Sequence, residues 1–183
     1  LGIGHELAAG EVAARGNFCT IDEAGQVTDR RAGRIGTELN EELVEALDDI
    51  SLDGCEITLK TVKGHRFLLT LRGDRVGGGA LSDTDPQQTG VAPERCRAHD
   101  EASTSTAELV NEWAAAAQEA LAGREPANGV LLRGFASKPD WPTLPDIYGV
   151  RALCVAGYPM YRGVSRLVGM EAFDEIVVMR SGR

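Results

Sequence analysis

The most informative stretch of the chain for its fold is residues 55–72, CEITLKTVKGHRFLLTLR. Apolar and polar side chains alternate from Cys55 to Val62, which is the pattern of a strand with one buried face. Lys63 and Gly64 form a turn signal, and the apolar run from His65 to Arg72 predicts a second, more deeply buried strand. These two strands are therefore expected to form an antiparallel hairpin.

One amphipathic helix is predicted before this hairpin in the sequence and another after it. Apolar residues recur at helical spacing from Thr37 to Ile50, and again from Thr104 to Ala122 before Gly123 ends the pattern. Further elements are predicted as strands at 17–21, 26–29, 129–133, 150–156 and 175–179 and a short helix at 161–169. Because later strands alternate with helices while the early ones form hairpins, the sequence predicts an α/β layered sandwich with a mixed central sheet flanked by helices.

Composition narrows the classes of partner. The 183 residues are 43% hydrophobic and 26% charged, as in ordinary globular domains. The net charge of −9 is opposite in sign to that of a general nucleic-acid binder, and no apolar run approaches the roughly 18 residues that span a bilayer. We therefore expect neither a nucleic acid nor a membrane as partner.

The four cysteines lack pair spacing, which favours a reducing, cytoplasmic compartment, and neither they nor the scattered histidines predict a metal site in this chain.

Basic residues are concentrated at a few positions. Arg30, Arg31 and Arg34 lie within five residues and would repel one another unless they face an anion or nearby carboxylates, although a solvated face is an alternative. Arg133 ends an apolar strand, at the kind of sheet edge where ligands gather, although it also fits a plain strand-end charge.

Several short motifs follow one another along the chain. They are Asp29-Arg-Arg-Ala-Gly-Arg34, Gly64-His65-Arg66, Leu81-Ser-Asp83-Thr-Asp85-Pro86, Leu131-Leu-Arg133-Gly134 and Gly157-Tyr-Pro-Met-Tyr-Arg162-Gly163. In this order they resemble the archaeal-type, cofactor-independent (2,3-bisphosphoglycerate-independent) phosphoglycerate mutases. The resemblance covers nearly the whole chain, and bacterial members of that family have sometimes been labelled phosphonopyruvate decarboxylase-like.

The resemblance implies an isomerase of glycolysis and gluconeogenesis that interconverts 3-phosphoglycerate and 2-phosphoglycerate through a phosphoserine intermediate. An alkaline-phosphatase-like domain would carry the serine and two divalent metal ions of the Mn, Mg or Zn type, and an inserted lid domain would bind substrate. Residues 1–135 would be this insert, and residues 136–183 a linker and the start of the return into the phosphatase-like domain. The isolated chain, without that partner domain, is expected to be inactive and to bind no metal.

The resemblance also assigns roles to individual residues. The expected substrate-binding residues are Arg30, Arg31, Arg34, His65, Arg66, Arg133 and Arg162. Asp85 or Asp83 would lie near the migrating hydroxyl proton, although turn chemistry before Pro86 also explains both aspartates. Arg162 stands where relatives often carry lysine, and Gln87 where histidine is expected. Two alternatives remain: a related metallophosphatase-superfamily enzyme acting on another phospho or phosphono compound, and a non-catalytic anion-binding module.

Overall fold

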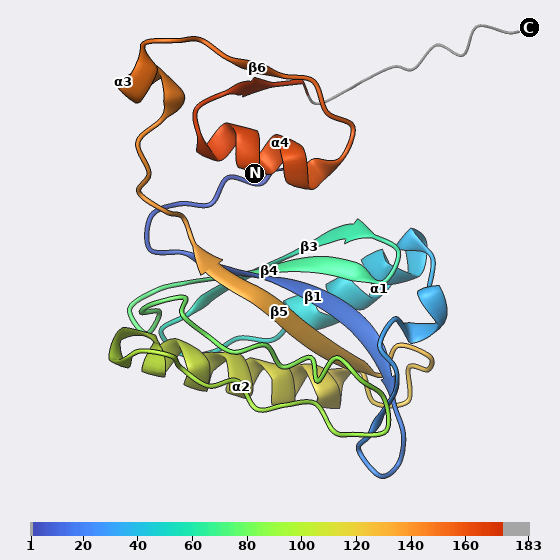
Figure 1. The fold of residues 1–183 in the computed structure, drawn as a ribbon. Coiled ribbons are helices and arrows are strands. Elements are labelled where there is room, and N and C mark those ends of the chain that lie inside the picture. The colour runs from blue at the N-terminus through green and yellow to red at the C-terminus, as the bar shows by residue number, and fades with distance from the viewer. Residues whose placement is uncertain (1, 174–183) are drawn as a thin grey trace, which may run out of the picture. The chain divides into compact units, whose positions relative to one another are not determined.

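The computed structural model describes residues 2–173, which divide into two compact units (Figure 1). The larger, Ala8–Lys138, is called here the sheet unit. The smaller combines residues 2–7 with residues 139–173 and is called the small unit. The strand predicted at 175–179 lies outside the described residues.

The sheet unit is built on a five-stranded sheet. Its central strand β1 (Val12–Ile21) pairs on one side with β4 (Arg66–Arg72) and on the other with β5 (Gly129–Ser137). The strand β3 (Glu56–Lys63) pairs with β4, and the short β2 (Val27–Asp29) pairs with the end of β1. The predicted hairpin of residues 55–72 is thus confirmed as β3 and β4.

Both long helices pack against the same side of this sheet (Figure 1). Helix α1 (Thr37–Asp48) precedes β3 and contacts β3 and β4, whereas α2 (Thr104–Ala120) precedes β5 and contacts it. The two helices also contact each other. Two short 3₁₀ helices, η1 (Ala32–Arg34) and η2 (Glu101–Ser103), lie in the connections before α1 and α2.

Each helical connection joins two strands that run parallel but are separated by a third. The strand β4 lies between β1 and β3, and β1 lies between β4 and β5, so all hydrogen-bonded neighbours in the sheet unit are antiparallel. This is the split βαβ, or ferredoxin-like, arrangement. The α/β prediction is confirmed, but the sheet is antiparallel instead of mixed, because each crossover skips a strand.

The core between sheet and helices is centred on three aromatic rings. Phe67 on β4 lies 4.8 Å from Phe18 on β1 and 6.2 Å from Trp113 on α2, measured between ring centroids, and all three side chains are fully buried. Gly16 on β1 faces the Phe67 ring so closely that a Cβ atom would overlap it. Since side chains alternate along a strand, residues 12, 14, 16 and 18 face the helices, and residues 13, 15 and 17 face the opposite side.

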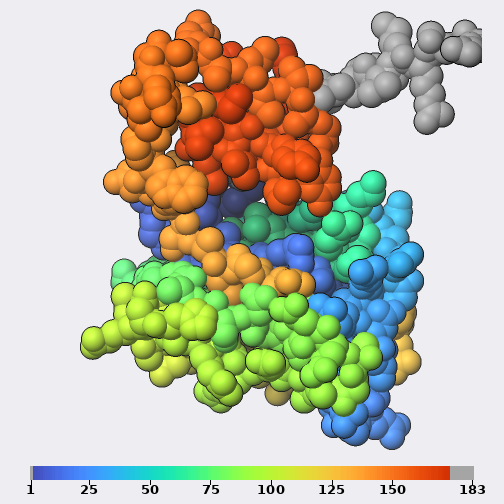
Figure 2. Space-filling view, in the orientation of Figure 1, coloured from blue at the N-terminus to red at the C-terminus, as the bar shows by residue number. Residues whose placement is uncertain are grey.

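The long connection between β4 and η2 is hydrogen-bonded to β5. The Thr84 amide donates to the Leu132 carbonyl at 2.8 Å, and the Leu132 amide donates to the Thr84 hydroxyl at 2.8 Å. Figure 2 shows this connection, in green, packed beside β5, in orange. The pairing places Asp83 and Asp85, the neighbours of Thr84, next to the last residues of β5.

The small unit contains α3 (Leu144–Tyr148), α4 (Pro159–Leu167) and a two-stranded parallel sheet of β6 (Leu153–Cys154) and β7 (Glu171–Ala172). The helix predicted at 161–169 is confirmed as α4. The buried strand predicted at 150–156 is wrong in length and burial, since only β6 forms and Leu153 is 53% exposed. A sheet of two strands this short is too small to bury the apolar side chains of residues 150–156. No helix within residues 2–173 is long and apolar enough to cross a membrane.

Candidate anion-binding site

Three neighbouring strands carry arginines on the sheet face opposite α1 and α2. Arg15 on β1 lies directly across from Arg133 on β5, and Asn17 on β1 lies across from Arg66 on β4. Side chains of directly opposed residues on one face have Cβ atoms about 5 Å apart. The strand register therefore brings together guanidinium groups that are distant in sequence.

These side chains line a pocket of about 320 Å³ in the sheet unit. The loop after β2 and the β3–β4 turn complete the wall. The lining residues are Arg15, Asn17, Arg30, Arg31, His65, Arg66 and Arg133. The volume is at the lower end of the range typical of small-molecule sites, and five of the seven lining residues are arginines.

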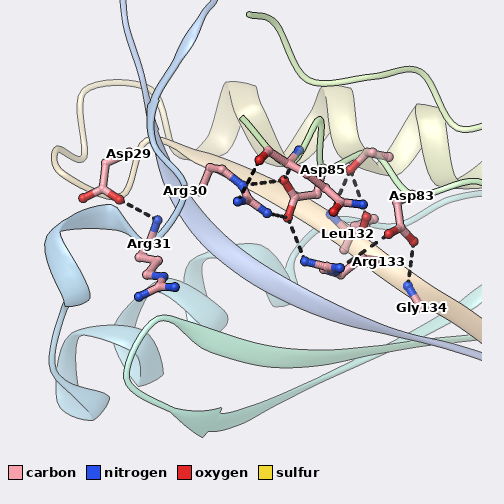
Figure 3. Close-up of polar contacts among 10 residues, drawn as sticks. Asp29, Arg30, Arg31, Asp83, Asp85, Leu132, Arg133 and Gly134 are labelled. Atoms are coloured by element: carbon pink, nitrogen blue, oxygen red, sulfur yellow. Dashed lines mark hydrogen bonds and ion pairs between the residues drawn. The ribbon is translucent and has the colours of Figure 1, made fainter. Parts of the chain in front are cut away.

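Asp85 holds two of these arginines in position (Figure 3). Arg30 donates from Nε to Oδ1 at 2.8 Å and from Nη2 to Oδ2 at 2.7 Å, and Arg133 donates from Nη1 to Oδ2 at 3.4 Å. The Asp85 side chain is 0% exposed, while each arginine side chain is 29% exposed. The carboxylate therefore lies beneath guanidinium groups that still reach solvent.

The same contacts keep Asp85 ionised. Burial alone would raise the pKa of its carboxyl group, but hydrogen bonds from Arg30 and the Gln87 amide, with the charges of Arg30 and Arg133, outweigh burial and lower that pKa. A carboxylate with a lowered pKa is a weak base. The geometry therefore suits Asp85 to orienting the arginines.

Asp83 connects the segment between β4 and η2 to strand β5. Its Oδ1 accepts a hydrogen bond from the Gly134 amide at 2.8 Å, and its Oδ2 lies 3.7 Å from Nε of Arg133. Together, Asp83 and Asp85 place carboxylates on both sides of the Arg133 guanidinium (Figure 3). The aspartates in the Leu81–Pro86 motif thus fix the orientation of Arg133.

The loop carrying Arg30 and Arg31 is shaped by Asp29. The Asp29 carboxylate accepts hydrogen bonds from the amides of Arg31 and Gly33, both at 2.8 Å. Ala32, Gly33 and Arg34 then follow with φ of 47°, 63° and 58°, a left-handed run that is unfavourable for residues with a side chain. The Asp29 hydrogen bonds help to maintain this strained turn.

The pocket has more positive than negative charge. Among the described residues, Arg30 and Arg133 have carboxylate partners, whereas Arg15, Arg31 and Arg66 form no ion pair. Burial, followed by the charges of Arg133 and Arg66, lowers the pKa of Arg15, although a guanidinium remains protonated at neutral pH. Three uncompensated guanidinium groups in one concavity are chemically suited to bind an anion with several oxygen atoms.

His65 lies at the β3–β4 turn beside these cations. Burial lowers the pKa of its imidazole, and the charges of Arg66 and Arg31 lower it further. Since an ordinary histidine titrates near pH 6.5, His65 is neutral at physiological pH and contributes a hydrogen-bonding group without adding charge.

Comparison with known proteins identifies the family. The family profile described as "2,3-bisphosphoglycerate-independent phosphoglycerate mutase" matches residues 1–128. The chain belongs to this family. A protein from Thermus thermophilus named "Probable 2,3-bisphosphoglycerate-independent phosphoglycerate mutase" is 44% identical over 173 residues, and one of the same name from Aquifex aeolicus is 37% identical over 182 residues.

The match to these mutases is partial in length. The alignments cover 93% of this chain but 42% of the Thermus protein, and 95% of this chain but 45% of the Aquifex protein. A solved structure, "Cofactor-Independent Phosphoglycerate Mutase from Thermoplasma acidophilum DSM 1728", superposes with a TM-score of 0.70 at 31% identity, covering 94% of this chain and 50% of that one. The chain thus spans less than half of the length of its curated mutase relatives.

The structure brings together most, but not all, of the residues that the mutase resemblance singled out. Five of them line the pocket: Arg30, Arg31, His65, Arg66 and Arg133. Asp85 lies against two of the pocket's arginines and Asp83 beside one of them. Arg34 does not line the pocket, and Arg162 is on α4 of the small unit.

Sequence reasoning missed Arg15 and Asn17 as lining residues. Their spacing of two on a strand was the available signal, because residues i and i+2 share a face. The predicted strand began at residue 17 and so did not include Arg15. Only the pairing of β1 with β4 and β5 shows that this face is the pocket wall.

The divalent metal ions that the resemblance assigns to a phosphatase-like domain find no site among the described residues. No group of three or more His, Cys, Asp or Glu side chains within residues 2–173 is placed to hold a metal ion. Two carboxylates beside the pocket, Asp83 and Asp85, are engaged with Arg30 and Arg133. No chemical step is therefore assigned to a metal in this part of the chain.

Proposed function

We propose that this chain is the substrate-binding part of a cofactor-independent phosphoglycerate mutase, an isomerase that interconverts 3-phosphoglycerate and 2-phosphoglycerate in glycolysis and gluconeogenesis. The observation that carries the proposal is the pocket in which five arginines meet and three have no carboxylate partner among the described residues. Phosphoglycerate has a phosphate and a carboxylate, and planar guanidinium groups bind both with paired hydrogen bonds.

The proposed role of these arginines is to position the ligand and neutralise its charge. Phosphoryl transfer depends mainly on alignment of the reacting groups and on stabilisation of negative charge. Arg30 and Arg133, held by Asp85, would supply fixed donors, and Arg15, Arg31 and Arg66 the excess positive charge. The roles of Asp85 or Asp83 near the migrating proton, and of Arg34 and Arg162 in binding, stay predictions from the resemblance.

The chemical step would belong to another part of the polypeptide. Cofactor-independent mutases are in general metal-dependent, and the proposed phosphoserine intermediate needs a nucleophilic serine. We place both the serine and two divalent ions in an alkaline-phosphatase-like domain, within the length that the relatives have and this chain does not span. Residues 1–135 would form the inserted lid and residues 136–183 the linker and return.

Exposed apolar side chains in the small unit support this domain assignment. Those more than half exposed are Trp141, Ile147, Tyr148, Leu153, Val155, Tyr158, Met160, Tyr161, Val164 and Phe173. So many exposed apolar side chains in a unit of this size are typical of a surface that contacts another protein surface. We propose that the phosphatase-like domain covers it.

The test is an activity assay on the full-length protein that contains this chain. We expect it to convert 3-phosphoglycerate to 2-phosphoglycerate without added 2,3-bisphosphoglycerate, as followed by ³¹P NMR, while the 183-residue chain alone does not. Release of inorganic phosphate without isomerisation would contradict the proposal and favour a related phosphatase. Because the matched relatives are named as mutases, no observation favours that alternative or a non-catalytic anion-binding module.

A further inference from the structure

Asn17 lies in the wall of the arginine pocket with its side-chain oxygen unused. The residue is 8% exposed, and its Oδ1 is shielded from solvent and accepts no hydrogen bond from the described residues. A buried amide oxygen without a donor is destabilising, and folded proteins seldom retain one without a reason. An unsatisfied acceptor in a pocket wall indicates a donor group on the ligand.

Strand geometry places this acceptor next to the cationic groups. Asn17 follows Arg15 by two residues on the same face of β1 and lies across from Arg66 on β4. Residues two apart on a strand are separated by about 7 Å. A small ligand held by the arginines therefore lies beside the Asn17 amide, and its contact with the covered Oδ1 requires a rotation of the Asn17 side chain.

The chemistry of the wall determines which ligand group Asn17 can bind. Arginine side chains donate hydrogen bonds and cannot accept them, so they bind the ionised oxygens of a ligand. The Asn17 Oδ1 can only accept, and it would repel a carboxylate or phosphate oxygen. A hydroxyl group is the uncharged donor that small anionic metabolites most simply offer.

We propose that Asn17 Oδ1 accepts a hydrogen bond from a hydroxyl group of the bound anion, so that the pocket selects hydroxylated anions over deoxy anions of equal charge. This inference rests on the proposed function, because each isomer of phosphoglycerate carries one free hydroxyl. Asn17 is then a specificity-determining residue, because it accepts a hydrogen bond from the hydroxyl group and arginine side chains cannot accept one.

A purely structural role for Asn17 makes a different prediction. Nε of Arg66 is also buried without an acceptor, and Arg66 is the register partner of Asn17. If Asn17 served only to orient Arg66, its loss would weaken the binding of every anion equally. Hydroxyl recognition predicts a loss confined to ligands that carry the hydroxyl.

The experiment compares 3-phosphoglycerate with its 2-deoxy analogue, 3-(phosphonooxy)propanoate, by NMR titration of the ¹⁵N-labelled 183-residue chain. We expect the wild-type chain to bind 3-phosphoglycerate at least tenfold more tightly, with a shift of the Asn17 side-chain amide signals for that ligand alone. Because this comparison needs no substitution, it does not depend on the folding of any variant. Equal affinity for the two ligands would overturn the inference.

A variant then assigns the preference to Asn17. In Asn17→Ala we expect the affinity for 3-phosphoglycerate to fall about tenfold and that for the deoxy analogue to stay within twofold. Thr58→Ala, which removes an exposed polar group from β3 outside the pocket, is the matched control and should change neither affinity. Equal losses for both ligands in Asn17→Ala would overturn the inference in favour of Arg66 support. Binding of neither ligand to the wild-type chain would overturn the proposed function as well.

Discussion

The Arg30 guanidinium binds the buried Asp85 carboxylate through two nitrogen atoms, with Nε 2.8 Å from Oδ1 and Nη2 2.7 Å from Oδ2. Asp85 also contacts Arg133 at 3.4 Å, so one carboxylate fixes two arginines from different elements. Because Asp85 offsets part of the charge of these two, the net positive charge of the pocket comes mainly from Arg15, Arg31 and Arg66. The pocket thus combines fixed donors with an uncompensated positive charge.

Removal of Arg133 tests whether the fixed donors act on substrate. In the full-length protein we expect Arg133→Ala to lower kcat/KM tenfold or more, since a hydrogen bond to a charged group is worth about 1.5–3 kcal/mol. Arg75→Ala is the matched control, because Arg75 forms an exposed ion pair with Glu112 outside the pocket. An Arg133→Ala enzyme with kinetics within twofold of wild type would exclude this residue from the site.

Asp85→Asn should destabilise the sheet unit, because asparagine removes the carboxylate that pairs with Arg30 and leaves Arg133 with Asp83 alone. We expect a loss of about 1–3 kcal/mol in the free energy of unfolding, less than for a fully buried ion pair since the arginines remain partly exposed. Urea unfolding of the 183-residue chain at pH 7 measures it. An unchanged midpoint would show that Asp85 does not support the arginines.

The same pair predicts a dependence of stability on pH. The folded-state pKa of Asp85 lies below its ordinary value of about 3.9, so its contribution is present above about pH 4 and is lost as the pH falls through the lowered value. The stability difference between wild type and Asp85→Asn should therefore be constant from pH 5 to 8 and shrink only below pH 4. Asp74→Asn, at an exposed position, should show no such difference. A difference that already shrinks between pH 7 and 5 would contradict the lowered pKa.

His65 predicts how anion binding responds to pH. Because burial and neighbouring arginines lower its pKa below the ordinary value of about 6.5, protonation adds a positive charge to the pocket only at more acidic pH. The affinity of the chain for sulfate, which does not titrate in this range, should be constant from pH 8 to 7 and rise only below pH 6.5. The rise should be absent in His65→Gln. A pKa of His65 at or above 6.5 in the ligand-free chain, measured by NMR titration of its ring protons, would contradict this account.

Gly16 tests the packing beneath the pocket. A Cβ atom at this position would overlap the buried Phe67 ring, so we expect Gly16→Ala to destabilise the sheet unit by about 1–3 kcal/mol, as overpacked cores do. Gly157→Ala is the control, since a Cβ there meets no atom within 4 Å. Equal unfolding midpoints for the two variants would show that β1 and β4 can separate without cost.

Local sequence patterns predicted most of the elements but not the way in which the strands pair. The β3–β4 hairpin follows from alternation around one turn and was predicted with both of its strands. The antiparallel sheet depends on which strands the helical connections skip, and that is set by long-range packing. The start of β1 was missed because Val12 to Gly16 is rich in alanine and glycine, which have low strand propensity.

The residues of the site also differ in whether local sequence or long-range strand pairing identifies them. Motif resemblance named Arg30 and Arg133, whose side chains do meet through Asp85. It also named Arg34, but the left-handed run at Gly33 and Arg34 turns the chain at that point, and Arg34 does not line the pocket. Arg15 could be found only from its register with Arg133. Short motifs therefore predicted which charged groups form the site, whereas the strand register was needed to find the remaining lining residues.

The central claim is that these arginines bind one phosphoglycerate molecule together. The direct measurement is a titration of the 183-residue chain, ¹⁵N-labelled at arginine side chains, with 3-phosphoglycerate. We predict that the Nε–H signals of the five pocket arginines shift with a single dissociation constant while that of Arg124, outside the pocket, does not. The five are Arg15, Arg30, Arg31, Arg66 and Arg133. Shifts spread over surface arginines such as Arg124, or no shift of the five pocket signals at saturating ligand, would contradict the claim.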